Sequence, residues 1–268
     1  MLLPALAFLL VTFVLPLSIV VVRSFTDPKA GVGDYREALT SPLYLHVLAN
    51  TFIIAFAVTA ATLVIGYLYA YLMTLAPRLW RTVLLVAVLL PFWTSLLIRS
   101  FAWILLLRDT GAVNSALQGI GLVEHPVPLI RNMTGVVIGM VQVMLPFAVL
   151  PLYASMRGID RGLLHAAEGL GARPLLAFWR IFVPLTAPGL AAASLLVFIQ
   201  SLGFYVTPAL LGGPHSVMLS QLIVDQVSTT LRWGFASALA VILLVTTGLF
   251  LLAASRFLDL RRLLRTLP

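Results

Sequence analysis

The chain has 268 residues, of which 61% are hydrophobic and 10% are charged, with a mean hydropathy of +1.08 and a formal net charge of +8. A soluble domain of this size needs more charge to cover its surface, so the composition excludes that class and indicates an α-helical membrane protein. The chain contains no cysteine, which excludes thiolate catalysis, cysteine-bound metals and disulfides. Arginines on cytoplasmic loops explain the positive charge better than nucleic-acid binding does.

Six apolar stretches are long enough to cross a hydrocarbon core, which takes about 20 residues. In chain order they are Leu3–Val22, Ala49–Leu75, Thr82–Leu107, Gly135–Ala154, Pro188–Leu211 and Phe235–Ala254. A signal peptide is the alternative for the first stretch, but its apolar run is too long and neither a basic segment nor a small-residue cleavage site flanks it. The sequence therefore predicts one membrane domain, residues 1–268, of the all-α class with six transmembrane helices.

The basic residues orient these predicted helices. One set of connecting segments carries ten arginines against three acidic residues, whereas the other set carries six basic residues matched by six acidic ones. The arginine-rich set comprises Arg78, Arg81, Arg157, Arg161, Arg173, Arg180, Arg256, Arg261, Arg262 and Arg265. Basic residues gather on the cytoplasmic side of a bacterial inner membrane. This set, and with it both termini, is therefore predicted to be cytoplasmic.

Two outer segments, 109–121 and 216–227, mix apolar and polar residues at helical spacing. This pattern predicts short interfacial or re-entrant helices, and ordinary connectors lying on the membrane surface fit it equally well. The last stretch, 254–268, places leucines at helical spacing beside arginines. It indicates a cytoplasmic tail that contacts anionic membrane lipid.

The acidic residues limit the possible membrane chemistry. None of the nine lies within the predicted spans, and carriers driven by protons or sodium ions usually need a buried carboxylate. An ATP-independent carrier is therefore a disfavoured alternative. The chain has no His-Glu-x-x-His motif and no P-loop, which argues against a membrane protease and against ATP binding by this chain. Energy for uphill transport would enter from another subunit, through a cytoplasmic loop.

One cytoplasmic loop, at about 156–184 between the fourth and fifth spans, contains "HAAEGLGARPLLAFWRIFVP". It resembles the EAA loop of ABC importer permeases. The matching residues, at the family's spacing, are His165, Ala166, Ala167, Gly171, Ile181, Val183 and Pro184. Two of them depart from the family pattern, because His165 replaces a glutamate and Val183 replaces a leucine.

The residues of this loop predict two short helices. Residues 161–170 fit an amphipathic helix that Gly169 and Gly171 end or bend, and its small residues would let it enter a groove of a partner. Residues 172–184 fit an apolar helix along the membrane interface, which Pro184 stops. The alternative is an interfacial helix that only ties two spans together.

The resemblance implies that the loop couples the chain to an ABC ATPase dimer that binds ATP and Mg²⁺. The chain itself would be a transport subunit with no catalytic residue, cofactor or metal. The implied coupling residues are His165, Ala166, Ala167, Glu168, Gly171, Arg173 and Pro184. Glu168 lies three residues after His165, on nearly the same helix face. We hypothesise that Glu168 supplies the anionic contact that His165 cannot, and a solvated glutamate without a role is the alternative.

Two further stretches, 90–114 and 203–223, resemble spermidine/putrescine-type permeases. The resemblance implies an importer built from two permeases, two ATPase subunits and an extracytoplasmic solute-binding protein. It implies a polyamine as the first choice of cargo, with phosphonates, opine-like amino acid derivatives, thiamine and iron as alternatives. Whether the second permease is a different chain or another copy stays open.

The predicted substrate path includes Arg99, the one charged residue inside a span, which should face the bundle interior or water. Snorkelling to the outer interface is the alternative. Pro208 removes a helix hydrogen bond, so the fifth span is expected to break near Phe204 and to serve as a gate. Aromatic faces attract cationic amines, although Arg99 would repel a polyamine and favour an anionic or zwitterionic cargo. The candidates are Trp93, Arg99, Trp103, Phe204, Tyr205 and Pro208.

Overall fold

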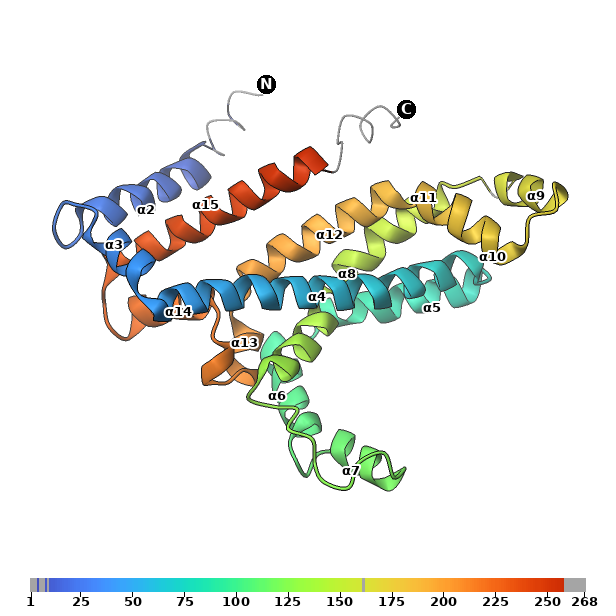
Figure 1. Ribbon diagram of the computed structural model, residues 1–268, viewed down its shortest axis with the longest axis horizontal. Coiled ribbons are helices and arrows are strands. Elements are labelled where there is room, and N and C mark those ends of the chain that lie inside the picture. Colours follow the sequence, from blue (N-terminus) through green and yellow to red (C-terminus); the bar gives the residue numbers. More distant parts are fainter. Residues whose placement is uncertain (1–3, 5–7, 9, 161, 258–268) are drawn as a thin grey trace. The chain divides into compact units, whose positions relative to one another are not determined.

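The computed structural model describes residues 4, 8, 10–160 and 162–257, and all regular structure within these residues is helical (Figure 1). Contacts divide the chain into two compact units. Unit 1 holds the described residues up to Phe52 and those from Ser216 onward, and unit 2 holds Ile53–His215. Each unit has its own packing.

Unit 1 is built around one apolar cluster. Its members are Ala38, Val47, Leu219, Phe235, Leu239 and Ile242. The elements of this unit are the π-helix η1 (Leu10–Val14), α2 (Leu15–Thr26), α3 (Gly33–Thr40), the start of α4 (Pro42–Leu75), α14 (Leu219–Ser228) and α15 (Trp233–Phe257). The buried Thr51 hydroxyl accepts the Leu219 backbone N–H at 2.8 Å. This bond gives the first turn of α14 an acceptor that the helix itself cannot supply.

Unit 2 contains the rest of α4 and the elements that follow it. They are α5 (Arg78–Leu89), the 3₁₀ turn η2 (Leu90–Trp93), α6 (Leu96–Leu107), α7 (Ala112–Gly119), α8 (Met133–Arg157), α9 (Gly162–Gly169), α10 (Pro174–Ala177), the π-helix η3 (Phe178–Phe182), α11 (Val183–Leu185), α12 (Ala187–Leu202), α13 (Val206–Leu211) and η4 (Pro214–Ser216). The core of the unit lies along α8, which contributes the buried Met140, Met144, Ala148 and Leu152. Helix α12 packs along α8, and Gly189 allows its first turn to approach Ser155 closely.

Three of the described helices are long and apolar enough to cross a membrane alone: Pro42–Leu75, Met133–Arg157 and Trp233–Ala253. Two bent pairs pass the same test together, Arg78–Trp93 with Leu96–Gly119 and Pro174–Leu185 with Ala187–Leu202, which gives up to five spans. The helix Leu10–Thr26 is apolar but shorter, and the predicted first stretch begins outside the described residues. The predicted all-helical membrane class is confirmed.

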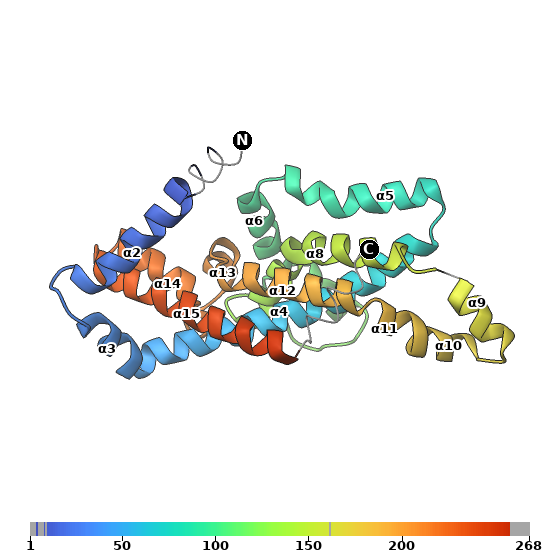
Figure 2. The ribbon, with the colours of Figure 1, turned by 90° about the horizontal axis from the view of Figure 1, so that it is seen from above.

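The predicted third span, Thr82–Leu107, is not one continuous helix. Helix α5 gives way to η2 at Leu90 and Pro91, Thr94 and Ser95 are extended, and α6 leaves at 102° to the first segment (Figure 2). Pro91 cannot donate the next helical hydrogen bond and its ring opposes the preceding turn. The run stays apolar through the break, so hydropathy gives no sign of it.

The expected break in the fifth span is present. Helix α12 ends at Leu202 and α13 begins at Val206, with Gly203 and Phe204 between them. The predicted outer segments do contain helices: α7 lies within 109–121, and α14 covers most of 216–227 and ends one residue later. Buried Asn114 fixes α7 by bonding the Val127 backbone in both directions, at 2.8 and 3.0 Å. Most of the predicted lipid-binding tail, 254–268, lies outside the described residues.

Candidate functional site

The loop after α8 carries a short helix with defined ends. Asp160 accepts the Gly162 backbone N–H at 2.8 Å and begins α9. At the other end the Ala172 N–H donates to the Ala167 carbonyl at 3.0 Å and the Gly171 N–H donates to the Glu168 carbonyl at 2.9 Å. These two bonds form a Schellman ending, which needs a left-handed residue. Gly171 supplies it with φ +89°, which explains why the loop requires glycine there.

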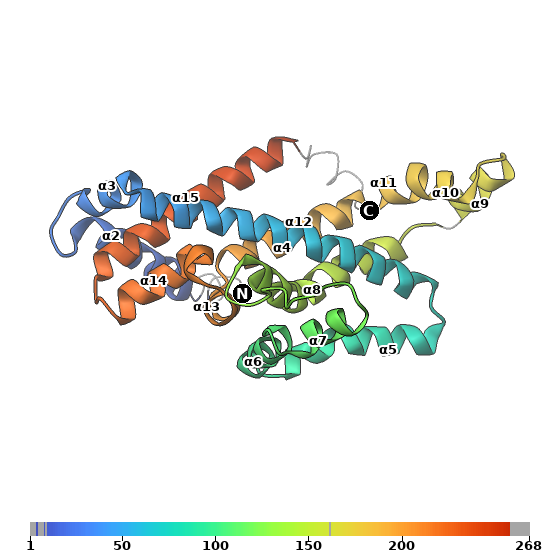
Figure 3. The same ribbon diagram turned by 60° about the horizontal axis from the view of Figure 1, so that its bottom comes forward.

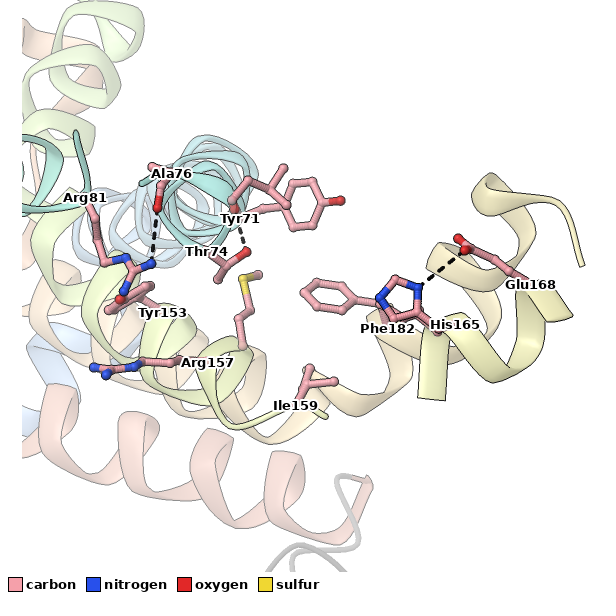
Figure 4. A pocket seen from close by; sticks show the side chains of 13 residues that line it. Tyr71, Thr74, Ala76, Arg81, Tyr153, Arg157, Ile159, His165, Glu168 and Phe182 are labelled. Atoms are coloured by element: carbon pink, nitrogen blue, oxygen red, sulfur yellow. Dashed lines mark hydrogen bonds and ion pairs between the residues drawn. The ribbon is translucent and has the colours of Figure 1, made fainter. Parts of the chain in front are cut away.

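The exposed face of α9 presents His165 and Glu168. The Nδ1 atom of His165 lies 3.6 Å from Oε2 of Glu168, with side-chain exposures of 77% and 43%. Their side chains face each other in Figure 4, which agrees with the shared helix face expected from their spacing. Ala166 is exposed and Ala167 is half-buried. This side of α9 is exposed, and it combines two polar side chains with small alanine residues. A partner could therefore approach it closely.

The second predicted helix of the loop is continuous but not a regular α-helix. It runs through α10, η3 and α11, and its middle is a π-helix. Phe178 and Phe182 stack there at 5.5 Å between ring centroids, and both meet the edge of Tyr71 on α4, at 5.2 and 5.4 Å. These aromatic contacts anchor the loop to the core of unit 2.

The remaining loop residues lie at the ends of this second helix. Arg173 is exposed and immediately precedes Pro174, which begins α10. Pro184 is exposed within α11, and Thr186 follows it, bonding the Val183 carbonyl at 2.7 Å and the Tyr67 hydroxyl at 3.1 Å. Pro188 then begins the first turn of α12, after a bend of 59°. Figure 1 and Figure 3 show α9 and α10 at the end of unit 2 where α4 turns into α5.

A cavity of about 490 Å³ lies between α9 and the adjoining ends of α4, α5 and α8, and His165 and Glu168 border it (Figure 4). Its polar lining includes Tyr71, Arg81, Tyr153, Arg157, His165 and Glu168. The guanidinium of Arg81 donates to the Ala76 carbonyl at 3.2 Å through Nη2, while its buried Nε has no hydrogen-bond partner within the described residues. Arg81 was expected only as one of the orienting arginines, and Tyr153 was not expected to have a role. Only their place beside the loop in space makes them notable.

A second cavity, of about 160 Å³, lies at the break between α5 and α6. Arg99 and Phe204 line it together with Phe92, Phe147 and Gln200. The Nε atom of Arg99 is buried and has no hydrogen-bond partner within the described residues. An unpaired guanidinium nitrogen is costly inside a membrane protein, so an acceptor is expected there in the working state.

The other predicted path residues do not line either cavity. Trp93 is 78% exposed, and Tyr205 is 39% exposed. Trp103 donates its ring N–H to Gln142 Oε1 at 3.4 Å, and Pro208 is buried in α13. The structure thus brings together only Arg99 and Phe204. Gln142 and Gln200 were missed, although a lone polar residue within an apolar span was the signal that could have identified them.

Comparison with known proteins identifies the family of the chain. Residues 77–263 match the family described as binding-protein-dependent transport system inner membrane component. The spermidine/putrescine transport system permease protein PotB of Escherichia coli (strain K12) is 36% identical, over 84% of this chain and 83% of that protein. PotB of Haemophilus influenzae is 35% identical, over 80% and 74%.

The fold comparison agrees. A crystal structure of a bacterial ABC transporter involved in the import of the acidic polysaccharide alginate superposes with a TM-score of 0.77. The match covers 97% of this chain and 93% of that one at 19% identity, so it speaks for the fold alone. With the family match across most of its length, the chain belongs to the binding-protein-dependent transport system inner membrane components and is a permease subunit of such an importer.

Proposed function

We propose that this permease subunit is driven by an ABC ATPase dimer that binds helix α9. The observation that carries the proposal is the construction of α9, an exposed helix with defined ends that leads into α12 through a segment whose aromatic residues are anchored on Tyr71 of α4. Movement of α9 would be passed along α10, η3 and α11 into the spans, so that the permease alternates between outward and inward access. ATP and Mg²⁺ bind the ATPase, and this chain holds no cofactor.

The proposed topology has six spans with both termini in the cytoplasm. The apolar helix Leu10–Thr26 would be the first span, followed by the three single helices and the two bent pairs. The segments that carry most arginines then face the cytoplasm, and α9 lies among them. A second permease subunit completes the translocation path, and a solute-binding protein delivers cargo to the outer face.

The proposed cargo is a polyamine, by analogy with PotB. The aromatic face of Phe204 would attract an amine, at roughly 0.5–2 kcal/mol. One observation favours a second candidate, an anionic or zwitterionic cargo. The buried Nε of Arg99 has no acceptor within the described residues, and Arg99 shares its cavity with Phe204. A carboxylate or phosphonate would supply that acceptor.

The ATPase contact is tested in the assembled importer, reconstituted with its ATPase and binding protein. Glu168→Ala and His165→Ala are measured for cargo-stimulated ATP hydrolysis, with Glu124→Ala as the control because Glu124 is an exposed acid outside the loop. Loss of one charged contact at the centre of an interface is expected to weaken coupling by about tenfold, or about 1.4 kcal/mol. Full coupling in Glu168→Ala would remove Glu168 from the proposed contact.

The cargo is tested with the cognate binding protein and with Arg99. Thermal stabilisation of the binding protein by spermidine, a phosphonate and amino acid derivatives names the class of cargo. Transport by Arg99→Gln then assigns the role of the side chain. A polyamine importer is expected to keep its transport in this variant, whereas an importer whose anionic cargo contacts Arg99 is expected to lose it.

A further inference from the structure

The cavity beside α9 is lined by more basic than acidic side chains. Arg81 reaches it from the first turn of α5, and Arg157 reaches it from the last residue of α8. Glu168 is the one acidic residue in its lining, and it lies 3.6 Å from His165. Figure 4 shows the two arginines on one side of the cavity, opposite His165 and Glu168. Neither arginine forms an ion pair within the described residues.

Both arginines also have guanidinium N–H groups that donate no hydrogen bond within the described residues. The Nε atom of Arg81 is buried without an acceptor among the described residues, and leaving a buried donor in that state is unfavourable. Arg157 makes no hydrogen bond within the described residues, and Tyr153, one helical turn before it, lines the same cavity. A multivalent oxygen acceptor placed between the two arginines would satisfy these groups together.

We propose that this cavity binds a phosphate group, held between Arg81 and Arg157. The planar guanidinium matches phosphate oxygens in pairs, and a volume of about 490 Å³ leaves room for a group attached to the phosphate. Two sources present this chemistry: the phosphodiester of an anionic membrane lipid and a soluble phosphate compound. Basic pockets between the cytoplasmic ends of membrane helices suit lipid headgroups, an argument that rests on the proposed topology.

An occupied cavity would bear on coupling because α9 forms its opposite wall. Leu164, His165 and Glu168 of α9 line the cavity together with the arginines of α5 and α8. A bound phosphate would fill the space into which α9 could otherwise move. The site therefore links an anionic ligand to the position of the helix that we propose as the ATPase contact.

The test measures binding without ATP or cargo, so its result does not depend on coupling. The assembled importer is placed in nanodiscs of phosphatidylcholine with or without phosphatidylglycerol, and native mass spectrometry counts the anionic lipids it retains. In phosphatidylcholine nanodiscs, calorimetry measures binding of inorganic phosphate and glycerol phosphate. The variants are Arg157→Gln and Arg81→Gln/Arg157→Gln, and Arg78→Gln is the control because Arg78 lies on α5 outside the cavity.

Loss of a paired guanidinium contact is expected to weaken binding about tenfold for Arg157→Gln and more for the double variant, with Arg78→Gln like wild type. Loss of retained phosphatidylglycerol identifies the lipid source, and loss of glycerol phosphate affinity identifies the soluble source. Arg157 makes no hydrogen bond to any described residue, so its variant stays informative even where the double variant fails to fold. Retention of lipid and affinity for phosphates that are the same in wild type and Arg157→Gln would overturn the proposal.

Discussion

Two regions of the molecule place charged side chains beside a glycine, and they are built in opposite ways. Before α15 in unit 1, the Arg232 guanidinium donates to both oxygens of Glu37, at 3.0 and 2.8 Å, and lies 4.3 Å over the Phe235 ring. A Cβ atom on the neighbouring Gly234 would overlap the Asp27 carbonyl. After α9 in unit 2, nothing lies within 4 Å of a Cβ on Gly171, and the nearby arginines have no acidic partner within the described residues.

The difference distinguishes a region that stabilises the fold from a region that can bind a ligand or a partner. In unit 1 the charges satisfy each other and the glycine is required by close packing, so the region needs nothing further. In unit 2 the glycine is required only by its backbone conformation, while the side chains around it keep donors and space for something else. Four changes test this contrast, from the largest expected effect to the smallest.

The largest effect is expected for Gly234→Ala. The added methyl group would meet the backbone of Asp27, which cannot rotate away, and overpacking against backbone costs about 3 kcal/mol or more. The protein should lose its monodisperse peak in size-exclusion chromatography after extraction from membranes. Gly33→Ala is the control, because a Cβ there meets no atom within 4 Å. Equal behaviour of the two variants would contradict the close approach at Gly234.

Gly171→Ala should act on coupling and spare the fold. An alanine held at φ +89° costs about 1–2 kcal/mol, so the Schellman ending of α9 should fray and cargo-stimulated ATP hydrolysis should fall about tenfold at most. Gly169→Ala is the matched control: its position is helical, with open space around it, and alanine favours helix. An identical loss in both variants would mean that the left-handed turn is not what matters.

Arg232→Ala should lower thermal stability by a small amount. The guanidinium is half-exposed, and exposed ion pairs contribute about 0.2–1 kcal/mol, so the melting temperature in detergent should fall by a few degrees. Arg36→Ala provides the comparison, since Arg36 is exposed on α3, the helix that carries Glu37, and forms no ion pair within the described residues. A melting temperature unchanged by Arg232→Ala would make this cluster dispensable.

The smallest effect is expected in the pH dependence of stability, and it arises from the ionisation of Glu37. Hydrogen bonds from Arg232 lower the pKa of Glu37 below its ordinary value of 4.5. The stabilisation that the charged Glu37 side chain contributes is therefore complete above pH 4.5 and is lost as pH falls through the folded-state pKa. Burial raises the pKa of neighbouring Asp34 above 3.8, and that carboxyl therefore acts in the opposite direction. Its contribution is present at low pH and is lost as pH rises.

Melting curves from neutral pH to about pH 3.5 check this sign. Glu37→Gln should lose less stability over that range than wild type, because the charge that pairs with Arg232 is already gone. Asp225→Asn, a change at an exposed carboxyl of α14, should follow the wild-type curve. A steeper acid loss in Glu37→Gln than in wild type would reverse the assignment.

Features that depend on neighbouring residues could be predicted from the sequence. The helical class, the two helices of the α9 loop and the break of the fifth span follow from apolar periodicity and from glycine and proline. Gly171 at the end of α9 is a local requirement of this kind, and the structure has it there.

Features that depend on contacts between residues far apart in the sequence could not be predicted from it. Arg232 and Glu37 are 195 residues apart, and a single sequence does not pair them. Arg81 and Arg157 line the same cavity only because α5 begins there and α8 ends there. The kink at Pro91 was missed for another reason, since the apolar pattern continues across it and a proline can be accommodated inside a membrane helix.

The π-helix η3 has a consequence for the direction in which α9 points. A π-turn holds one residue more than an α-turn, and each residue of an α-helix adds about 100° of rotation. Removing one residue between Phe178 and Phe182 would restore regular winding, and four α-helical residues would then cover about the same rotation as the five residues of the π-turn, so that α9 would keep its direction. A chimera that exchanges the loop between related permeases should therefore tolerate one residue fewer at η3, whereas a residue removed from α10 or α11 would rotate α9 by about 100°.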